Sequence, residues 1–188
     1  MTKRLGDVNK YVATVGFRNV KIKDVNYFLE RVRREVYETH VQFFDAKLIA
    51  SQQHLYFAAL NALKAFEKKL NISSSLAIEV LLYASAQRQI RKAVDMLGIK
   101  PHSSQVAVLV IAETKRGADI ALEAVSKLIS GERDDHVLEL TDEKFEGVKK
   151  LFGVSDLEIE AKLRKEDLKK EALVDLVIEH VALLATQS

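Results

Sequence analysis

The chain has 188 residues, of which 48% are hydrophobic and 30% are charged, a balance typical of a folded protein with a single core. It holds seven Gly, one Pro and no Cys, which excludes collagen-like and low-complexity chains, disulfides, thiolate nucleophiles and Cys-ligated zinc. No segment approaches 18 uncharged apolar residues, and the N-terminus lacks the apolar stretch of a signal peptide. We therefore expect one soluble, intracellular (cytoplasmic) domain spanning 1–188, in which 1–9 form either a mobile tail or a strand extension.

The net charge of +2 hides an uneven distribution along the chain. Residues 1–100 contain 17 Lys and Arg against 9 Asp and Glu, whereas residues 101–188 contain 12 against 18. The two parts therefore carry net charges of +8 and −6. This asymmetry suggests a basic surface for a polyanion and a separate acidic region, although solvated helix faces of different composition explain it equally well.

In the first part of the chain, β-branched and apolar runs alternate with helical periodicity. Asp24 is a candidate N-cap, and Asn71 is a tolerable C-terminal cap. The pattern predicts a strand at 11–17, a helix at 25–36, one or two strands at 41–44 and 46–50, and a helix from 51 to about 71.

The middle of the chain is the most apolar. A helix predicted at 76–84 is apolar on nearly every side and should be mostly buried. Ser85 interrupts it, and a second helical segment follows. We expect Gly98 to end that segment, because Gly adopts a left-handed cap without strain and Pro101 cannot continue the helix. The unbroken apolar run 105–112 predicts an interior strand covered on both faces.

The remainder is mainly helical. The spacing predicts helices at 114–130, 141–152, 155–163 and 164–185, with a short edge strand at 137–140. No segment repeats at a fixed period. These elements predict a mixed α/β (α+β) fold, a single domain with helices packed around a small sheet.

Motifs of catalysis and metal binding are missing from the sequence. It has no GxGxxG, GxxxxGK[ST], HExxH or GxSxG pattern, so we expect no nucleotide cradle, no metal site, no cofactor and no catalytic residue. Asp134, Asp135 and His136 could be imagined as an acid–base pair. Adjacent side chains project in different directions, however, so an exposed turn explains them better.

Two features exceed this background. Six residues of the last helix form one apolar stripe, while Leu176 and Leu183 lie on a different side, which fits either core packing or the docking of a partner. The stripe consists of Leu173, Val174, Val177, Ile178, Val181 and Leu184. The second feature is the junction 83–90, where Arg88 could hold a phosphate or stack on a base and Gln89 could read base edges. Alternatively, Arg88 pairs with a carboxylate and the glutamines cap backbone groups.

The segments LIASQQHL at 48–55 and LAIEVLLYASAQRQI at 76–90 carry a resemblance to a known family. The chain resembles the archaeal form of the small kinase-binding subunit of the KEOPS complex, whose human counterpart is the PRPK-binding protein. The resemblance is sharpest over 46–112 and continues more loosely from Val8 to the C-terminus. The sequence departs from the family at Ser51 and Ala86, where the family favours Gly.

The resemblance implies a non-catalytic subunit with a small mixed α/β fold. KEOPS installs threonylcarbamoyl on the adenosine next to the anticodon of tRNA. The small subunit docks on the N-terminal lobe of an atypical kinase-like ATPase subunit, and in archaeal members it also holds the tRNA 3′ CCA end. No membrane or DNA partner is expected.

Residue by residue, the resemblance implies two contact sets. The kinase-binding set lies on the last helix and the helix at 76–84 and comprises Val177, Val181, Leu184, Leu76, Val80 and Tyr83. The tRNA-binding set comprises His54, Arg88 and Gln89 as a pocket, with Lys47, Arg31, Arg33 and Arg34 as a wider basic surface. The alternatives are a stand-alone RNA-binding module and a small-metabolite enzyme that uses the junction 85–90 as its pocket.

Overall fold

Residues 2–5, 8–36, 39–163 and 168–186 are described by the structure, a computed structural model. The strands are β1 (Thr2–Leu5), β2 (Lys10–Arg18), β3 (His40–Asp45), β4 (Val106–Ala112) and β5 (Glu132–Arg133). The α-helices are α1 (Val25–Glu35), α2 (Gln52–Glu67), α3 (Leu76–Ala84), α4 (Ile90–Leu97), α5 (Lys115–Leu128), α6 (Asp142–Phe152), α7 (Asp156–Lys162) and α8 (Lys169–Leu183). Among the described residues the 3₁₀ helices with defined bounds are η2 (Ala46–Leu48), η3 (Asp135–Leu138) and η5 (Leu184–Thr186). The mixed α/β prediction is confirmed.

The sheet is antiparallel with the order β1-β2-β4-β3, and the short β5 pairs with the far end of β2. Every residue of β4 is buried, because the strand lies between β2 and β3 with helices on both faces. Its continuous apolar sequence follows from this position. Residues 2–5, left open between a tail and a strand, form the outer strand β1.

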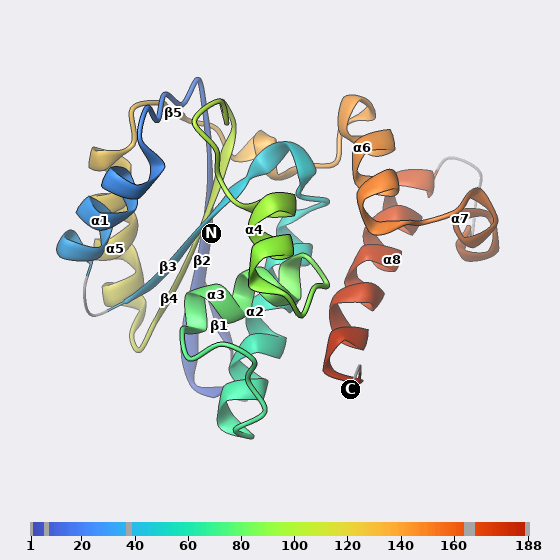
Figure 1. The fold of residues 1–188 in the computed structure, drawn as a ribbon, viewed down its shortest axis with the longest axis horizontal. Helices are drawn as coiled ribbons and strands as arrows, with labels where there is room; N and C mark the ends of the chain where they lie inside the picture. The colour runs from blue at the N-terminus through green and yellow to red at the C-terminus, as the bar shows by residue number, and fades with distance from the viewer. Residues whose placement is uncertain (1, 6–7, 37–38, 164–167, 187–188) are drawn as a thin grey trace.

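The helices form layers on either side of the sheet (Figure 1). On β2, Ala13, Val15 and Phe17 face the core beneath α1 and α5, whereas Val12 faces the core beneath α2, α3 and α4. This alternation is the period of two that a strand between two apolar layers requires. A third core lies between α6, α7 and α8, and α8 also packs on α2, so α2 is covered on two sides.

Two predicted strands are 3₁₀ helices instead. At 46–50, the Asp45 carboxylate accepts a hydrogen bond from the backbone N–H of Lys47 and turns the chain into η2. At 137–140, the Asp134 carboxylate accepts from the backbone N–H of His136 in the same way and opens η3. Local capping by Asp thus prevails over β-propensity at both places.

The structure also corrects the predicted conformation of one helix cap. Gly98 has an ordinary φ of −66°, so it provides no left-handed cap, whereas Gly153 with a φ of 67° does so at the end of α6. The predicted start of the last helix at 164 lies outside the described residues, and α8 begins at Lys169.

Candidate functional site

The side chains predicted to contact a kinase are core residues in the structure. Val177 and Val181 on α8 are completely buried, and the other four are also buried: Leu184, Leu76, Val80 and Tyr83. α8 is apolar on two sides because α2 covers one of them and α6 and α7 cover another. The prediction that these six side chains form a surface is therefore corrected. Leu183 is the large apolar residue that α8 exposes, at 54%.

His54 is also a core residue, which corrects its predicted place in a surface pocket. Its ring is completely buried; Nε2 donates to the Ala84 carbonyl at 2.7 Å, and Nδ1 accepts from the Ala50 N–H at 3.3 Å. It also lies edge-on to Phe152. Burial lowers the pKa of His54 to about 4, against the hydrogen bond to Ala84. The neutral His54 ring therefore links α2 to the end of α3 through a hydrogen bond.

The cationic residues of the predicted tRNA set do not converge. Arg31, Arg33 and Arg34 are exposed on α1, where the Arg31 guanidinium lies 5.9 Å from the centre of the Tyr27 ring. Arg88 and Gln89 are exposed at the junction of α3 and α4, on the other side of the sheet, and Lys47 is exposed in η2. The structure therefore separates the set into three surface regions.

The junction after α3 explains why the family favours Gly at the position of Ala86. Ser85 caps α3, and Ala86 follows in the left-handed region with a φ of 50°. The Ala86 N–H donates to the Tyr83 carbonyl and the Gln87 N–H to the Leu82 carbonyl, the two bonds of a Schellman motif. Gly adopts this conformation without strain, so the Gly favoured by the family suits the site better than Ala86.

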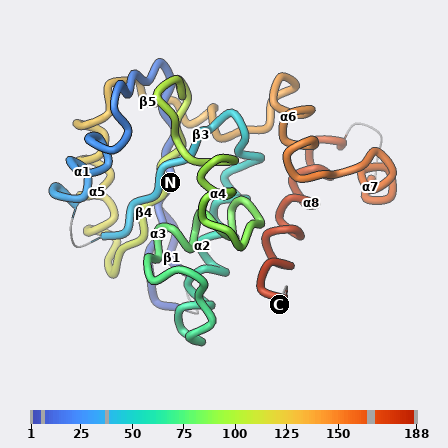
Figure 2. Tube along the Cα trace, in the orientation of Figure 1, coloured from blue at the N-terminus to red at the C-terminus, as the bar shows by residue number. Residues whose placement is uncertain are grey.

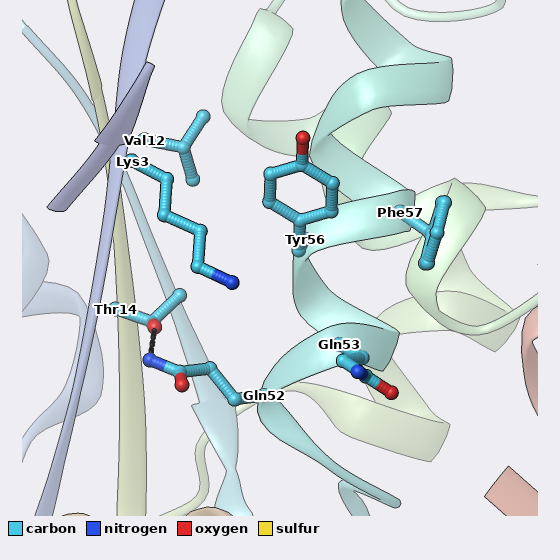
Figure 3. A pocket seen from close by; sticks show the side chains of 7 residues that line it. All are labelled: Lys3, Val12, Thr14, Gln52, Gln53, Tyr56 and Phe57. Atoms are coloured by element: carbon cyan, nitrogen blue, oxygen red, sulfur yellow. Dashed lines mark hydrogen bonds between the residues drawn. The ribbon is translucent and has the colours of Figure 1, made fainter. Parts of the chain in front are cut away.

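A pocket lined by polar and aromatic side chains lies between the sheet and the start of α2 (Figure 3). It has a volume of about 220 Å³ and is lined by Lys3, Val12, Thr14, Gln52, Gln53, Tyr56 and Phe57. We call it the sheet–α2 pocket. The Gln52 amide donates to the Thr14 hydroxyl at 2.6 Å, and the Lys3 ammonium lies 5.5 Å from the centre of the Tyr56 ring. An amide, an ammonium group and aromatic rings together can hold an unstacked base and its phosphate.

The elements that build this pocket explain why sequence reasoning missed it. Gln52 and Tyr56 are four residues apart on α2, as are Gln53 and Phe57, so a helix places both pairs on adjoining faces. That spacing was a readable signal, in the segment that carries the family resemblance. Lys3 lies opposite Val12 in the pairing of β1 with β2, and the packing of α2 on β2 brings it beside Tyr56. This packing of elements distant in the chain has no signal in the local sequence.

A second hollow lies beside the C-terminal part of α8. It has a volume of about 180 Å³ and is lined by Ser85, Ala86, Gln87, Met96, Leu151, Phe152, His180 and Leu183. We call it the α8 hollow. It joins the exposed part of α8 to the α3–α4 junction and shares no lining residue with the sheet–α2 pocket.

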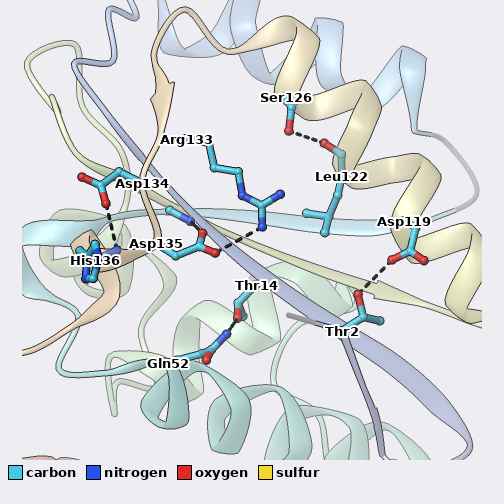
Figure 4. A network of polar contacts seen from close by, with 11 residues as sticks. Thr2, Thr14, Gln52, Asp119, Leu122, Ser126, Arg133, Asp134, Asp135 and His136 are labelled. Carbon is cyan, nitrogen blue, oxygen red and sulfur yellow. Dashed lines mark hydrogen bonds and ion pairs between the residues drawn. The ribbon is translucent and has the colours of Figure 1, made fainter.

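The side chains of segment 134–136 form contacts that hold η3 against β2 (Figure 4). Asp135 accepts from the backbone N–H of Gly16 at 3.0 Å and pairs with Arg133. Burial opposes the charged form, but these contacts outweigh it and lower the pKa of Asp135. η3 lies so close to β2 that a Cβ on Gly16 would meet the Asp134 carbonyl at 2.4 Å. Within the described residues, no group of three or more His, Cys, Asp or Glu could hold a metal, and no helix is long and apolar enough to cross a membrane.

Comparison with known proteins adds the family to this geometry. The model of the family described as kinase binding protein CGI-121 matches residues 17–185. The regulatory protein Cgi121 of Methanocaldococcus jannaschii is 28% identical over 148 residues, which cover 78% of this chain and 92% of that protein. The family match begins at the end of β2 and covers β3, β4, the buried α3 and the whole of α8. The chain therefore belongs to the CGI-121 family of kinase-binding proteins.

Proposed function

We propose that this chain is the non-catalytic small subunit of a KEOPS complex, which docks on the kinase-like ATPase subunit and holds the 3′ CCA end of tRNA. The family match over residues 17–185 carries the kinase-binding part of the proposal. The resemblance of the segments at 48–55 and 76–90 to the KEOPS subunit supports the ATPase of that complex as the kinase. The description of the family as kinase-binding supports a role in positioning partners, and both ring nitrogens of the buried His54 are held by backbone groups.

The kinase docks at the α8 hollow. Leu183 exposes more than half of its surface there, beside the half-buried Met96 and Leu151. An apolar side chain of the kinase that fills the hollow removes this surface from water, and each buried Leu-sized side chain contributes about 1.5–3 kcal/mol. The buried residues of α8 pack against α2, α6 and α7, and this packing fixes the position of Leu183.

Matched Leu-to-Glu variants test this site. Leu183→Glu places a charge at the hollow and should weaken kinase binding at least tenfold, the equivalent of ~1.4 kcal/mol. Leu157→Glu is the control, because Leu157 on α7 is 77% exposed and lies outside the hollow. Isothermal titration calorimetry with the purified kinase measures both. Equal affinities for the two variants would refute docking at the α8 hollow.

The tRNA 3′ end enters the sheet–α2 pocket. Its lining contains one cation, two amides and two aromatic rings, and the first hundred residues of the chain have a net charge of +8. Arg88 and Gln89 at the α3–α4 junction, together with Lys47, Arg31, Arg33 and Arg34, lie outside this pocket and supply a diffuse attraction to the rest of the tRNA. His54 takes no direct part, because its side chain is buried between α2 and the end of α3.

Mobility-shift titrations with one tRNA, intact and without its CCA end, test this part at about 0.15 M salt. Lys3→Gln and Gln53→Ala change exposed side chains of the pocket and should weaken binding of intact tRNA about tenfold. Neither should alter binding of the truncated tRNA. Arg33→Gln is the control for diffuse charge and should weaken both alike. Losses that do not depend on the CCA end would refute the pocket and leave a stand-alone basic surface as the explanation.

A further inference from the structure

The outer edge of the sheet at β3 is open. β3 pairs only with β4 among the described strands, and the strand order leaves its other side without a neighbour. The Ala46 N–H donates to the Gln105 carbonyl of the chain entering β4, and backbone direction alternates along a strand. The N–H and C=O groups of Val41 and Phe43 therefore point away from β4. The Gln42 side-chain amide donates to this outward Phe43 carbonyl at 2.9 Å, in the position that an added strand would take.

A groove of about 450 Å³ runs along this edge. α1 forms one wall and α3 and α4 form the other, and Figures 1 and 2 show β3 passing between these helices. The walls are mainly apolar, with Val25, Leu29 and Val32 on α1 and Ala77, Ile78 and Val94 on the opposite side. Val94 remains 42% exposed. Apolar walls on both sides of an open edge suit the alternating side chains of an extended strand.

The charges of the groove select the kind of strand. Its lining, within the described residues, includes the cation Arg33 and the titratable His40 and contains no carboxylate. The exposed charges of the walls also favour a negative partner. α1 has three Arg against two Glu, and α4 has one Arg and one Lys against one Asp. Carboxylates on the incoming strand would be attracted to Arg33.

We propose that the outer edge of β3 binds an extended segment of a partner protein as an added antiparallel or parallel strand, with apolar side chains alternating into the groove and a carboxylate beside Arg33. The occupant is a flexible acidic segment rather than the edge of a second folded copy. The β3 edge lies at the bottom of a groove between helices, and a second copy would bring its own α1, α3 and α4 into the same space. Gln42 leaves Phe43 when the strand arrives.

The experiment uses a displayed library of random peptides of about 12 residues, selected on the full-length protein. We expect enriched peptides to place apolar residues at every second position, to be rich in the strand-forming Thr and Val, and to carry Asp or Glu. Their affinity should fall at least about tenfold with Arg33→Glu and with Val41→Pro. Val41→Pro removes an N–H that points outward, so the ladder to β4 stays intact and the fold can be checked by circular dichroism. In the peptide, N-methylation of one parity of amides should abolish binding, and methylation of the other parity should leave it within twofold.

Other outcomes overturn the proposal. No enrichment, enrichment of peptides without acidic residues, or binding that survives Val41→Pro and both methylation patterns would show that the edge does not accept a strand of this chemistry. Self-association of the wild-type protein in sedimentation velocity that Val41→Pro abolishes would make a second copy the occupant. Kinase binding by Val41→Pro should be unchanged, which separates a failure here from a failure of the α8 hollow.

Discussion

The burial of His54 makes stability depend on pH in a defined window. In the folded protein burial lowers the His54 pKa to about 4, whereas in the unfolded chain it returns to its ordinary value of 6.5. The unfolded state therefore binds more protons between these values, and the stability contributed by the neutral ring is lost as the pH falls from 6.5 toward 4. The difference corresponds to about 3 kcal/mol, a large share of the free energy of unfolding of a domain of this size.

Protonation would also place a second ring N–H against the Ala50 N–H, where Nδ1 now accepts. Urea unfolding of the wild type and of His54→Gln at pH 8, 7, 6, 5 and 4.5 isolates this effect. We expect the wild type to be more stable at pH 8 and its advantage to shrink by about 2–3 kcal/mol at pH 4.5, while carboxylate effects cancel in the difference. An advantage that stays constant across this range would refute the buried, neutral histidine.

Three further predictions concern the core and its junctions. Ala86→Gly should raise the free energy of unfolding by about 1 kcal/mol, because the residue has a φ of 50°; a decrease in denaturation experiments would show that the left-handed conformation is not strained. Burial lowers the pKa of Lys144 to about 8, against Asp45 and Glu139, while its amine donates to the Val137 carbonyl at 2.5 Å. Relative to Lys144→Met, the wild type should therefore gain up to about 3 kcal/mol between pH 8 and 10.5, where the unfolded chain binds more protons, and a pH-independent difference would contradict this placement. Val181→Asp should lower stability by more than about 3 kcal/mol by burying a charge, so thermal melting and kinase binding should fail together; a folded variant with selectively lost binding would restore Val181 to the interface.

Much of the fold was predictable because local pattern and burial agree. The unbroken apolar run of β4 corresponds to a central strand, and Ser155 with Glu158 forms the capping box that opens α7. The wrong strand predictions at η2 and η3 have one cause. Asp45 and Asp134 cap short 3₁₀ helices, whereas the β-branched residues next to them are typical of strands.

The candidate sites were less predictable, because apolar periodicity does not distinguish core from interface. Val181 and Leu183 are two residues apart on α8, yet one is completely buried and the other exposed. The difference arises from the layers that cover α8, which are set by contacts distant in sequence. Lys3 reaches Tyr56 for the same kind of reason, because α2 packs on β2, the strand with which β1 pairs.

Two separate surfaces, the α8 hollow for the kinase and the sheet–α2 pocket for the tRNA 3′ end, form the centre of the proposed function. The most direct test mixes the protein with the purified kinase-like ATPase subunit and one intact tRNA and measures the particle masses by sedimentation velocity. Separate surfaces predict a ternary complex with one copy of each component, and a smaller yield of it with tRNA that lacks the CCA end. Displacement of the kinase by intact tRNA would contradict the account, because it would mean that the two partners share one surface.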